Sequence, residues 1–206
     1  MPSLSTLLLF AAASAALVAV PGPAVVYILT RGIAQGRSAG VVSALGIEAG
    51  ALVHVAAAVA GLSALVASSA TAFTIVKYGG AAYLVFLGVQ RLRARQELAL
   101  AELPRESHAR LFRQGVVVNA LNPKVAVFFV AFLPQFVDPA HAVVPQVALL
   151  GVLFVAIALV LDCAWALAAG SVGERLRRSL RVRRWLDRLS GATFIGLGAA
   201  AALSRR

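Results

Sequence analysis

Proline residues interrupt two long apolar stretches of this chain, at Pro21-Gly22-Pro23 in the first stretch and at Asn122-Pro123-Lys124 in the fourth. Proline lacks a backbone N–H and clashes with the carbonyl four residues earlier, so each segment must end or kink a helix. Inside the hydrocarbon of a bilayer, such a break is tolerated only where the freed polar groups face protein, water or a bound solute. The two breaks begin comparable halves of the chain, and paired breaks are typical of transporters that bind their substrate at the middle of the membrane.

The apolar stretches are long enough to cross a bilayer, and they leave no room for a separate soluble domain. Hydrophobic residues make up 61% and charged residues 13% of the 206 positions, which indicates an integral membrane protein. A spanning helix needs about 20 mostly apolar residues. We therefore predict an all-α integral membrane protein of one domain, residues 1–206, with six transmembrane helices at about 4–29, 39–67, 71–90, 115–136, 143–171 and 189–204.

The net charge of +11 comes mostly from arginines that gather in three connections between the predicted spans. Of the 19 Lys and Arg residues, all but four lie in these connections, within 31–37, 91–113 and 175–188. Cytoplasmic loops of membrane proteins carry an excess of positive charge, so we predict that these connections are cytoplasmic and that both termini lie outside. Topology thus explains the basic residues without nucleic-acid binding. The segment 173–189 also has the pattern of an interfacial helix that binds anionic membrane lipids.

Three ionisable residues lie inside the predicted spans: Glu48, Lys124 and Asp162. A charged group at the bilayer centre costs roughly 2.5 to 3.5 kcal/mol on insertion scales, so such residues usually serve a function or pair with one another. At about 1.5 Å of rise per residue, they lie at about the depth of the breaks at Gly22 and Asn122. We predict that all five residues surround a polar, partly wet cavity. The alternative is that Lys124 neutralises one of the acids in a buried pair that serves stability alone.

Short motifs follow one another along nearly the whole chain. They are Pro21-Gly22-Pro23; Gly46, Glu48, Gly50 and His54; Lys77 to Leu84 with Leu87-Gly88; Gly115; Asn119 to Lys124; Phe128-Phe129; Phe132 to Phe136; and Gly191 with Phe194 to Gly198. No single motif is specific. In this order, however, the set resembles the lysine exporter (LysE/RhtB) family of bacterial amino-acid efflux proteins.

The resemblance implies a six-helix exporter of the bacterial inner membrane, built as two three-helix inverted repeats with broken first and fourth helices. In this chain the repeats are expected at about 1–92 and 115–206, joined by a cytoplasmic loop at about 93–114. The implied activity is export of an amino acid or close derivative in exchange for protons, without a cofactor, a metal site or an enzymatic reaction. The residues expected near the substrate are Pro21, Gly22, Pro23, Glu48, Asn119, Asn122, Pro123, Lys124 and Asp162, with Glu48 and Asp162 also expected to carry the coupling proton.

A zwitterionic amino acid suits such a site, because one cavity can satisfy both of its charges. Its carboxylate would face Lys124 or the positive end of an interrupted helix, and its ammonium would face Glu48 or Asp162. Protonation of a buried acid from outside would then release the ammonium and couple export to inward proton flow. The sequence does not identify the amino acid.

Other functions fit the composition less well. Efflux of a small cation or divalent metal needs more ligands than two separated acids, Cys163 and His54 provide. A thiol redox protein needs a pair of cysteines, and the chain has one. A membrane scaffold would leave the buried charges as structural pairs. Glycines spaced as Gly46 and Gly50 let helices approach closely, which fits packing within one bundle or in a homodimer.

Overall fold

The computed structural model describes residues 2–68, 70–93 and 105–178 and isolated positions between 188 and 203. Within these residues all regular elements are helical, in agreement with the predicted all-α class. Two helices are long and apolar enough to cross a membrane, and each of two bent helix pairs qualifies as one further span. Only isolated positions of the predicted sixth span, 189–204, are described, so the arrangement as two inverted repeats stays a prediction.

The first bent pair is α1 (Leu4–Ala19) and α2 (Pro23–Gln35), which meet at 53°. Val20 has an extended backbone conformation. It precedes Pro21, and a helical conformation is disfavoured for the residue before a proline. Pro23 then begins α2, at the position where its missing N–H is not needed. The break predicted in the first span therefore separates two well-formed helices.

The second bent pair repeats this design, with an angle of 44°. Its elements are α5 (His108–Ala120), α6 (Pro123–Val127), the π-helical turn η1 (Phe128–Phe132) and the 3-10 turn η2 (Leu133–Phe136). Asn122 caps α6, since its Oδ1 accepts a hydrogen bond of 3.1 Å from the backbone N–H of Lys124. In both pairs an extended cap residue is followed by a proline in the first position of the next helix. This local device produces the predicted break in the fourth span.

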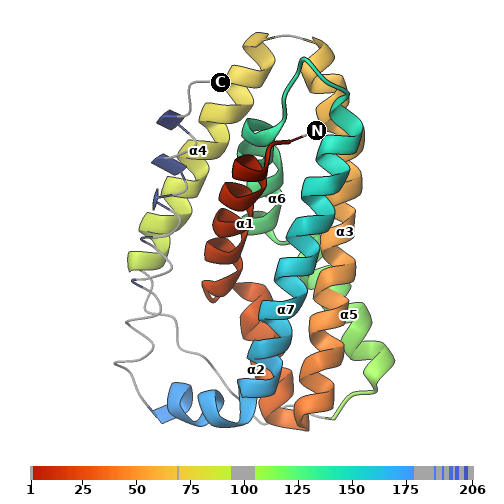
Figure 1. Cartoon of the computed structure of the whole chain (residues 1–206). Helices are drawn as coiled ribbons and strands as arrows, with labels where there is room; N and C mark the ends of the chain where they lie inside the picture. Colours follow the sequence, from red (N-terminus) through yellow and green to blue (C-terminus); the bar gives the residue numbers. More distant parts are fainter. Residues whose placement is uncertain are drawn as a thin grey trace.

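Three longer helices complete the described bundle: α3 (Arg37–Ser68), α4 (Ala70–Arg93) and α7 (Val143–Arg178). The helices α3 and α7 run nearly the full height of the molecule beside the bent pairs, and α4 packs against η1 and α6 (Figure 1). The end of α2, the start of α3, the start of α5 and the end of α7 all lie at one end of the molecule (Figure 1). The described residues 31–37, 105–113 and 175–178, which belong to the arginine-rich connections, lie at that end.

The helices α3 and α5 touch backbone to backbone. A Cβ atom on Gly50 would lie 2.5 Å from the carbonyl oxygen of Val116, and a Cβ atom on Gly46 would collide with the carbonyl of Phe112. A larger residue at either position would push the helices apart, so the prediction that these glycines allow close helix packing is confirmed. This contact fixes Asn119 of α5 against α3, next to Glu48.

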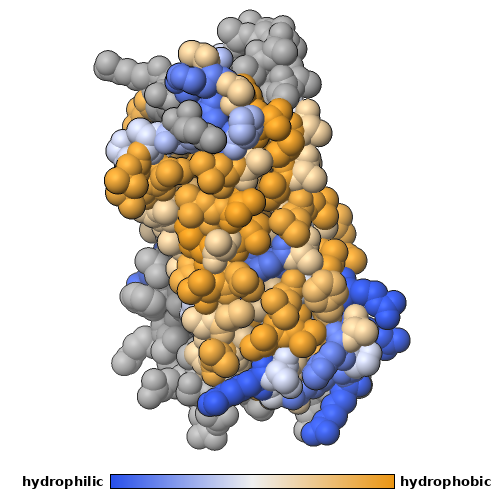
Figure 2. Space-filling model, turned by 45° about the vertical axis from the view of Figure 1, so that its right-hand side comes forward, coloured by the Kyte–Doolittle hydropathy of each residue, from blue (hydrophilic) through white to orange (hydrophobic). Residues whose placement is uncertain are grey.

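Apolar side chains cover the middle of the molecule on the face shown in Figure 2, and hydrophilic side chains gather toward its ends. Large hydrophobic residues are exposed on the surface of the described helices, including Leu8, Val152 and Val160, which are 60–69% exposed. Such a belt suits contact with lipid chains. Together with the long apolar helices, this belt indicates a membrane-spanning bundle.

Candidate functional site

One cavity lies between the two helix breaks, at the middle of the bundle. It is lined by Leu17, Val18, Gly22, Ala24, Val25, Ile47, Glu48, Asn119, Asn122, Lys124, Val125, Phe154, Ala158 and Asp162. These residues come from both bent pairs and from α3 and α7. The volume of about 30 Å³ has room for water, but it is far below the roughly 300 Å³ at which pockets for small ligands begin. The described conformation is thus a contracted one.

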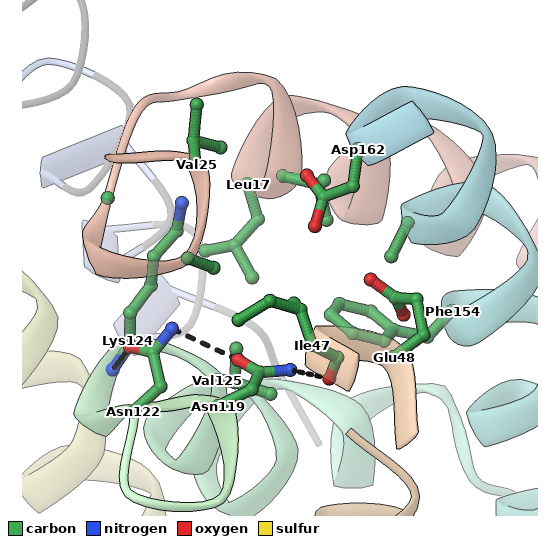
Figure 3. A pocket seen from close by; sticks show the side chains of 14 residues that line it. Leu17, Val25, Ile47, Glu48, Asn119, Asn122, Lys124, Val125, Phe154 and Asp162 are labelled. Atoms are coloured by element: carbon green, nitrogen blue, oxygen red, sulfur yellow. Dashed lines mark hydrogen bonds between the residues drawn. The ribbon is translucent and has the colours of Figure 1, made fainter. Parts of the chain in front are cut away.

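The three charged residues singled out from the sequence all line this cavity. Glu48 is 5%, Lys124 7% and Asp162 2% exposed. Figure 3 shows the carboxyl groups of Glu48 and Asp162 turned toward each other, with Lys124 on the opposite side of the cavity. The structure therefore brings together two acids and one ammonium from three different helices, as their similar depth predicts.

Lys124 reaches from the second break to the first. Its Nζ donates a hydrogen bond of 2.8 Å to the carbonyl oxygen of Val20, the residue that ends α1. Carbonyls at a helix end lack an intrahelical donor and carry partial negative charge, so an ammonium stabilises them. Gly22 leaves space for this side chain, because a Cβ there would lie 3.3 Å from Cδ and 3.5 Å from Nζ of Lys124.

Asparagine side chains connect the second break to α3. Asn122 Nδ2 donates to Asn119 Oδ1 at 3.2 Å, and Asn119 Nδ2 donates to the carbonyl of Ile47 at 2.8 Å (Figure 3). The backbone carbonyl of Asn119 is in turn 2.8 Å from His54 Nε2. Both asparagines are 2% exposed, and leaving a buried amide without its hydrogen bonds is costly. The network therefore holds the break in a set position beside Glu48.

The prolines that were expected near the substrate do not line the cavity. Pro21 is buried, whereas Pro23 and Pro123 are exposed, each at the first position of its helix. Their contribution is to create the breaks. The other six expected residues are all among the lining residues.

The predicted site residues do not include the apolar part of the lining. Phe154 and Ala158 lie eight and four residues before Asp162, which places them on the same face of α7. Helical spacing from the buried acid is the signal that could have found them. The apolar pattern of α7 itself could not, since this helix is apolar on nearly all sides.

The described residues contain no group of three or more His, Cys, Asp or Glu side chains arranged to hold a metal ion. In that part of the chain, the cavity offers two carboxyl groups, one ammonium and two amides. These groups are suited to a solute that carries both charges.

Comparison with known proteins gives consistent matches over nearly the whole chain. The family described as LysE type translocator matches residues 15–205. A homoserine/homoserine lactone efflux protein of Salmonella typhimurium is 32% identical over 186 residues, which cover 90% of each chain. A leucine efflux protein of Klebsiella pneumoniae is 31% identical over 193 residues, or 89% of this chain and 88% of that protein. An uncharacterized membrane protein of Vibrio cholerae is 36% identical over 179 residues, or 86% and 87%. No solved structure matches.

Proposed function

Because this chain belongs to the family of LysE type translocators, we propose that it exports an amino acid or a close derivative from the cytoplasm across the bacterial inner membrane, in exchange for protons. One observation carries the proposal. Two carboxyl groups and one ammonium, those of Glu48, Asp162 and Lys124, lie buried around one cavity between two broken helices. This arrangement is complementary to the two charges of a zwitterion.

In this proposal the substrate carboxylate binds next to Lys124 and the first turn of α2, where the positive end of the helix dipole favours an anion. The substrate ammonium binds next to Glu48 or Asp162. An uncharged side chain then meets the apolar lining, which includes Phe154 and Ala158. Because the contracted cavity holds only about 30 Å³, binding requires the helices around it to separate, and the two breaks are the natural hinges.

The facing carboxyl groups of Glu48 and Asp162 are the proposed coupling pair (Figure 3). Two negative charges repel each other strongly where water is excluded, so such a pair binds a proton or another cation. The substrate ammonium and the proton would therefore compete for the same pair. Protonation from outside releases the substrate, and loss of the proton to the cytoplasm prepares the pair for the next one.

The proposed orientation places the arginine-rich end of the bundle in the cytoplasm and both termini outside. The support is the excess of arginines in the three connections of the sequence, whose described residues 31–37, 105–113 and 175–178 lie at that end (Figure 1). The amino acid would then approach the cavity from the cytoplasm, past the end of α2 and the start of α5.

The test is transport by purified protein in liposomes. The liposomes are loaded with a mixture of amino acids, homoserine and homoserine lactone, and efflux is measured with and without an imposed pH gradient, with protein-free liposomes as the control. We expect efflux of at least one of these compounds, several-fold faster when the outer solution is acidic. An efflux rate that is the same with and without the pH gradient would contradict proton coupling. The absence of efflux for the whole mixture would contradict export itself.

A further inference from the structure

A second cluster of polar side chains joins α2 to the start of α5, outside the cavity described above. Arg31 Nη2 donates hydrogen bonds of 3.0 Å to Glu106 Oε1 and to Gln114 Oε1. The Tyr27 hydroxyl donates a hydrogen bond of 2.7 Å to the backbone carbonyl of Leu111 and lies 3.2 Å from the same Gln114 oxygen. Gln35 exchanges two hydrogen bonds with the backbone of Glu106, at 2.8 and 3.0 Å. The guanidinium also lies over the ring of Tyr27, 5.8 Å from its centre. Glu106, Gln114 and Tyr27 thus contact Arg31, and Gln35 holds the backbone of Glu106, which lies 75 residues from Arg31 in the sequence.

The cluster lies between the cavity and the arginine-rich end of the bundle. Arg31 follows the lining residue Ala24 by about two turns of α2, roughly 10 Å. Gln114 precedes the lining residue Asn119 by more than one turn of α5, roughly 7 Å. A solute that entered the cavity from that end between α2 and α5 would pass these side chains.

The ion pair at its centre is buried and incompletely satisfied. The side chains of Arg31 and Glu106 are 9% and 13% exposed. Arg31 Nη1 and Glu106 Oε2 are buried and find no hydrogen-bond partner within the described part of the chain. Buried polar groups are normally paired, so each residue keeps capacity for one more charged partner.

We infer that Arg31 and Glu106 form a cytoplasmic recognition site for a zwitterionic amino acid, in which the guanidinium binds the carboxylate and the Glu106 carboxylate binds the ammonium. The inference rests on the proposed function. The proposed site has other residues than the cavity, lies nearer the cytoplasmic end of the bundle, and binds amino acid only from the cytoplasmic face. Guanidinium is the side chain best suited to bind a carboxylate with two parallel hydrogen bonds.

The same pair closes the route when no amino acid is bound. At an N to O distance of 3.0 Å, Arg31 and Glu106 leave no space between them for a solute. Separating two buried charges is unfavourable unless each finds a new partner. A zwitterion supplies both partners together, whereas an inorganic ion or an apolar solute does not, so the site selects its ligand as it opens.

Membrane vesicles of both orientations test this inference, with homoserine and its lactone as the probes, because the lactone lacks the free carboxylate. Initial rates of exchange are measured while the probe is varied on one face at a time. For Arg31→Gln we expect the KM for homoserine to rise at least tenfold at the cytoplasmic face and to stay unchanged at the outer face. The KM for the lactone should change less than threefold. Glu106→Gln should raise the cytoplasmic KM for both probes.

Arg113→Gln is the matched control, since this arginine is an exposed residue of α5 near the same end, and it should leave both values unchanged. If Arg31→Gln does not reach the membrane, Arg31→Lys keeps the charge and should give an intermediate rise for homoserine. Equal shifts at both faces, equal shifts for both probes, or no shift would each overturn the inference. Failure of the wild-type protein to move either probe would instead count against the proposed export function with these substrates.

Discussion

The Nζ atom of Lys124 lies 2.8 Å from the carbonyl oxygen of Val20, so a side chain of the second helix break caps the helix that ends at the first. The two breaks are about 100 residues apart in sequence. Each therefore depends on the other for its local structure. A movement that separates them must find another partner for an ammonium and a carbonyl in a low-dielectric environment, where unpaired polar groups are costly.

Lys124→Met should destabilise the protein and stop transport. Methionine has a similar shape but cannot donate, so the carbonyl of Val20 loses this donor, at a cost of about 1–3 kcal/mol in the free energy of unfolding. Thermal unfolding in detergent measures the loss. Arg113→Met, at an exposed position of α5, should have no such effect. An unchanged unfolding temperature together with normal efflux would show that the contact is dispensable.

Gly46→Ala should weaken the contact between α3 and α5. The added methyl group would collide with the carbonyl of Phe112, and overpacking of this kind typically costs about 1–3 kcal/mol. Gly61→Ala is the control in the same helix, because a Cβ there meets nothing within 4 Å. Alanine is also the better helix former, by about 1 kcal/mol. We expect a lower unfolding temperature for the first variant only, and equal temperatures would contradict the backbone contact.

The parts of the site that could be predicted from sequence are those that are expensive to place in a membrane. Three residues stand out because a charged group in hydrocarbon is costly and is kept only where it has a function or a partner: Glu48, Lys124 and Asp162. Their distances in sequence from the basic connections indicate that they share one depth. The prolines were informative in the same way. They mark the breaks correctly, although Pro23 and Pro123 face outward and the residues beside them line the cavity.

The parts that could not be predicted depend on contacts between distant segments. The partner of Lys124 is a backbone carbonyl, which every residue carries, so nothing in the sequence distinguishes Val20. The sequence places Arg31 in a connection predicted to be cytoplasmic and Glu106 in the loop expected at about 93–114, yet the fold buries them together. The α5 helix also begins at His108, within the segment expected as a loop at about 93–114, because Ser107 caps it.

Asp162→Asn should abolish export driven by a pH gradient while leaving the fold intact. The amide matches the carboxyl group in shape but cannot take up a proton, so the proposed coupling pair with Glu48 no longer responds to the outer pH. Efflux in liposomes should fall to the rate seen without a gradient, with an unfolding temperature close to that of the wild type. Asp138→Asn, in a loop where the acid side chain is 48% exposed, should keep driven export. Retention of driven export by Asp162→Asn would remove its proposed role.

Ala158→Cys should become reactive toward a small, charged thiol reagent that does not cross membranes, in a background in which Cys163 is replaced by alanine. Ala158 lines the cavity and is 3% exposed in the contracted conformation, so reaction requires the cavity to open to water, where the thiolate forms. Val160→Cys is the control on the same helix, because Val160 is 69% exposed on the apolar belt and should meet lipid rather than reagent. A transported amino acid should slow the reaction at position 158 by occupying the cavity. If the two cysteines react equally slowly whether or not substrate is present, the cavity does not open to water, and the transport pathway must lie elsewhere in the bundle.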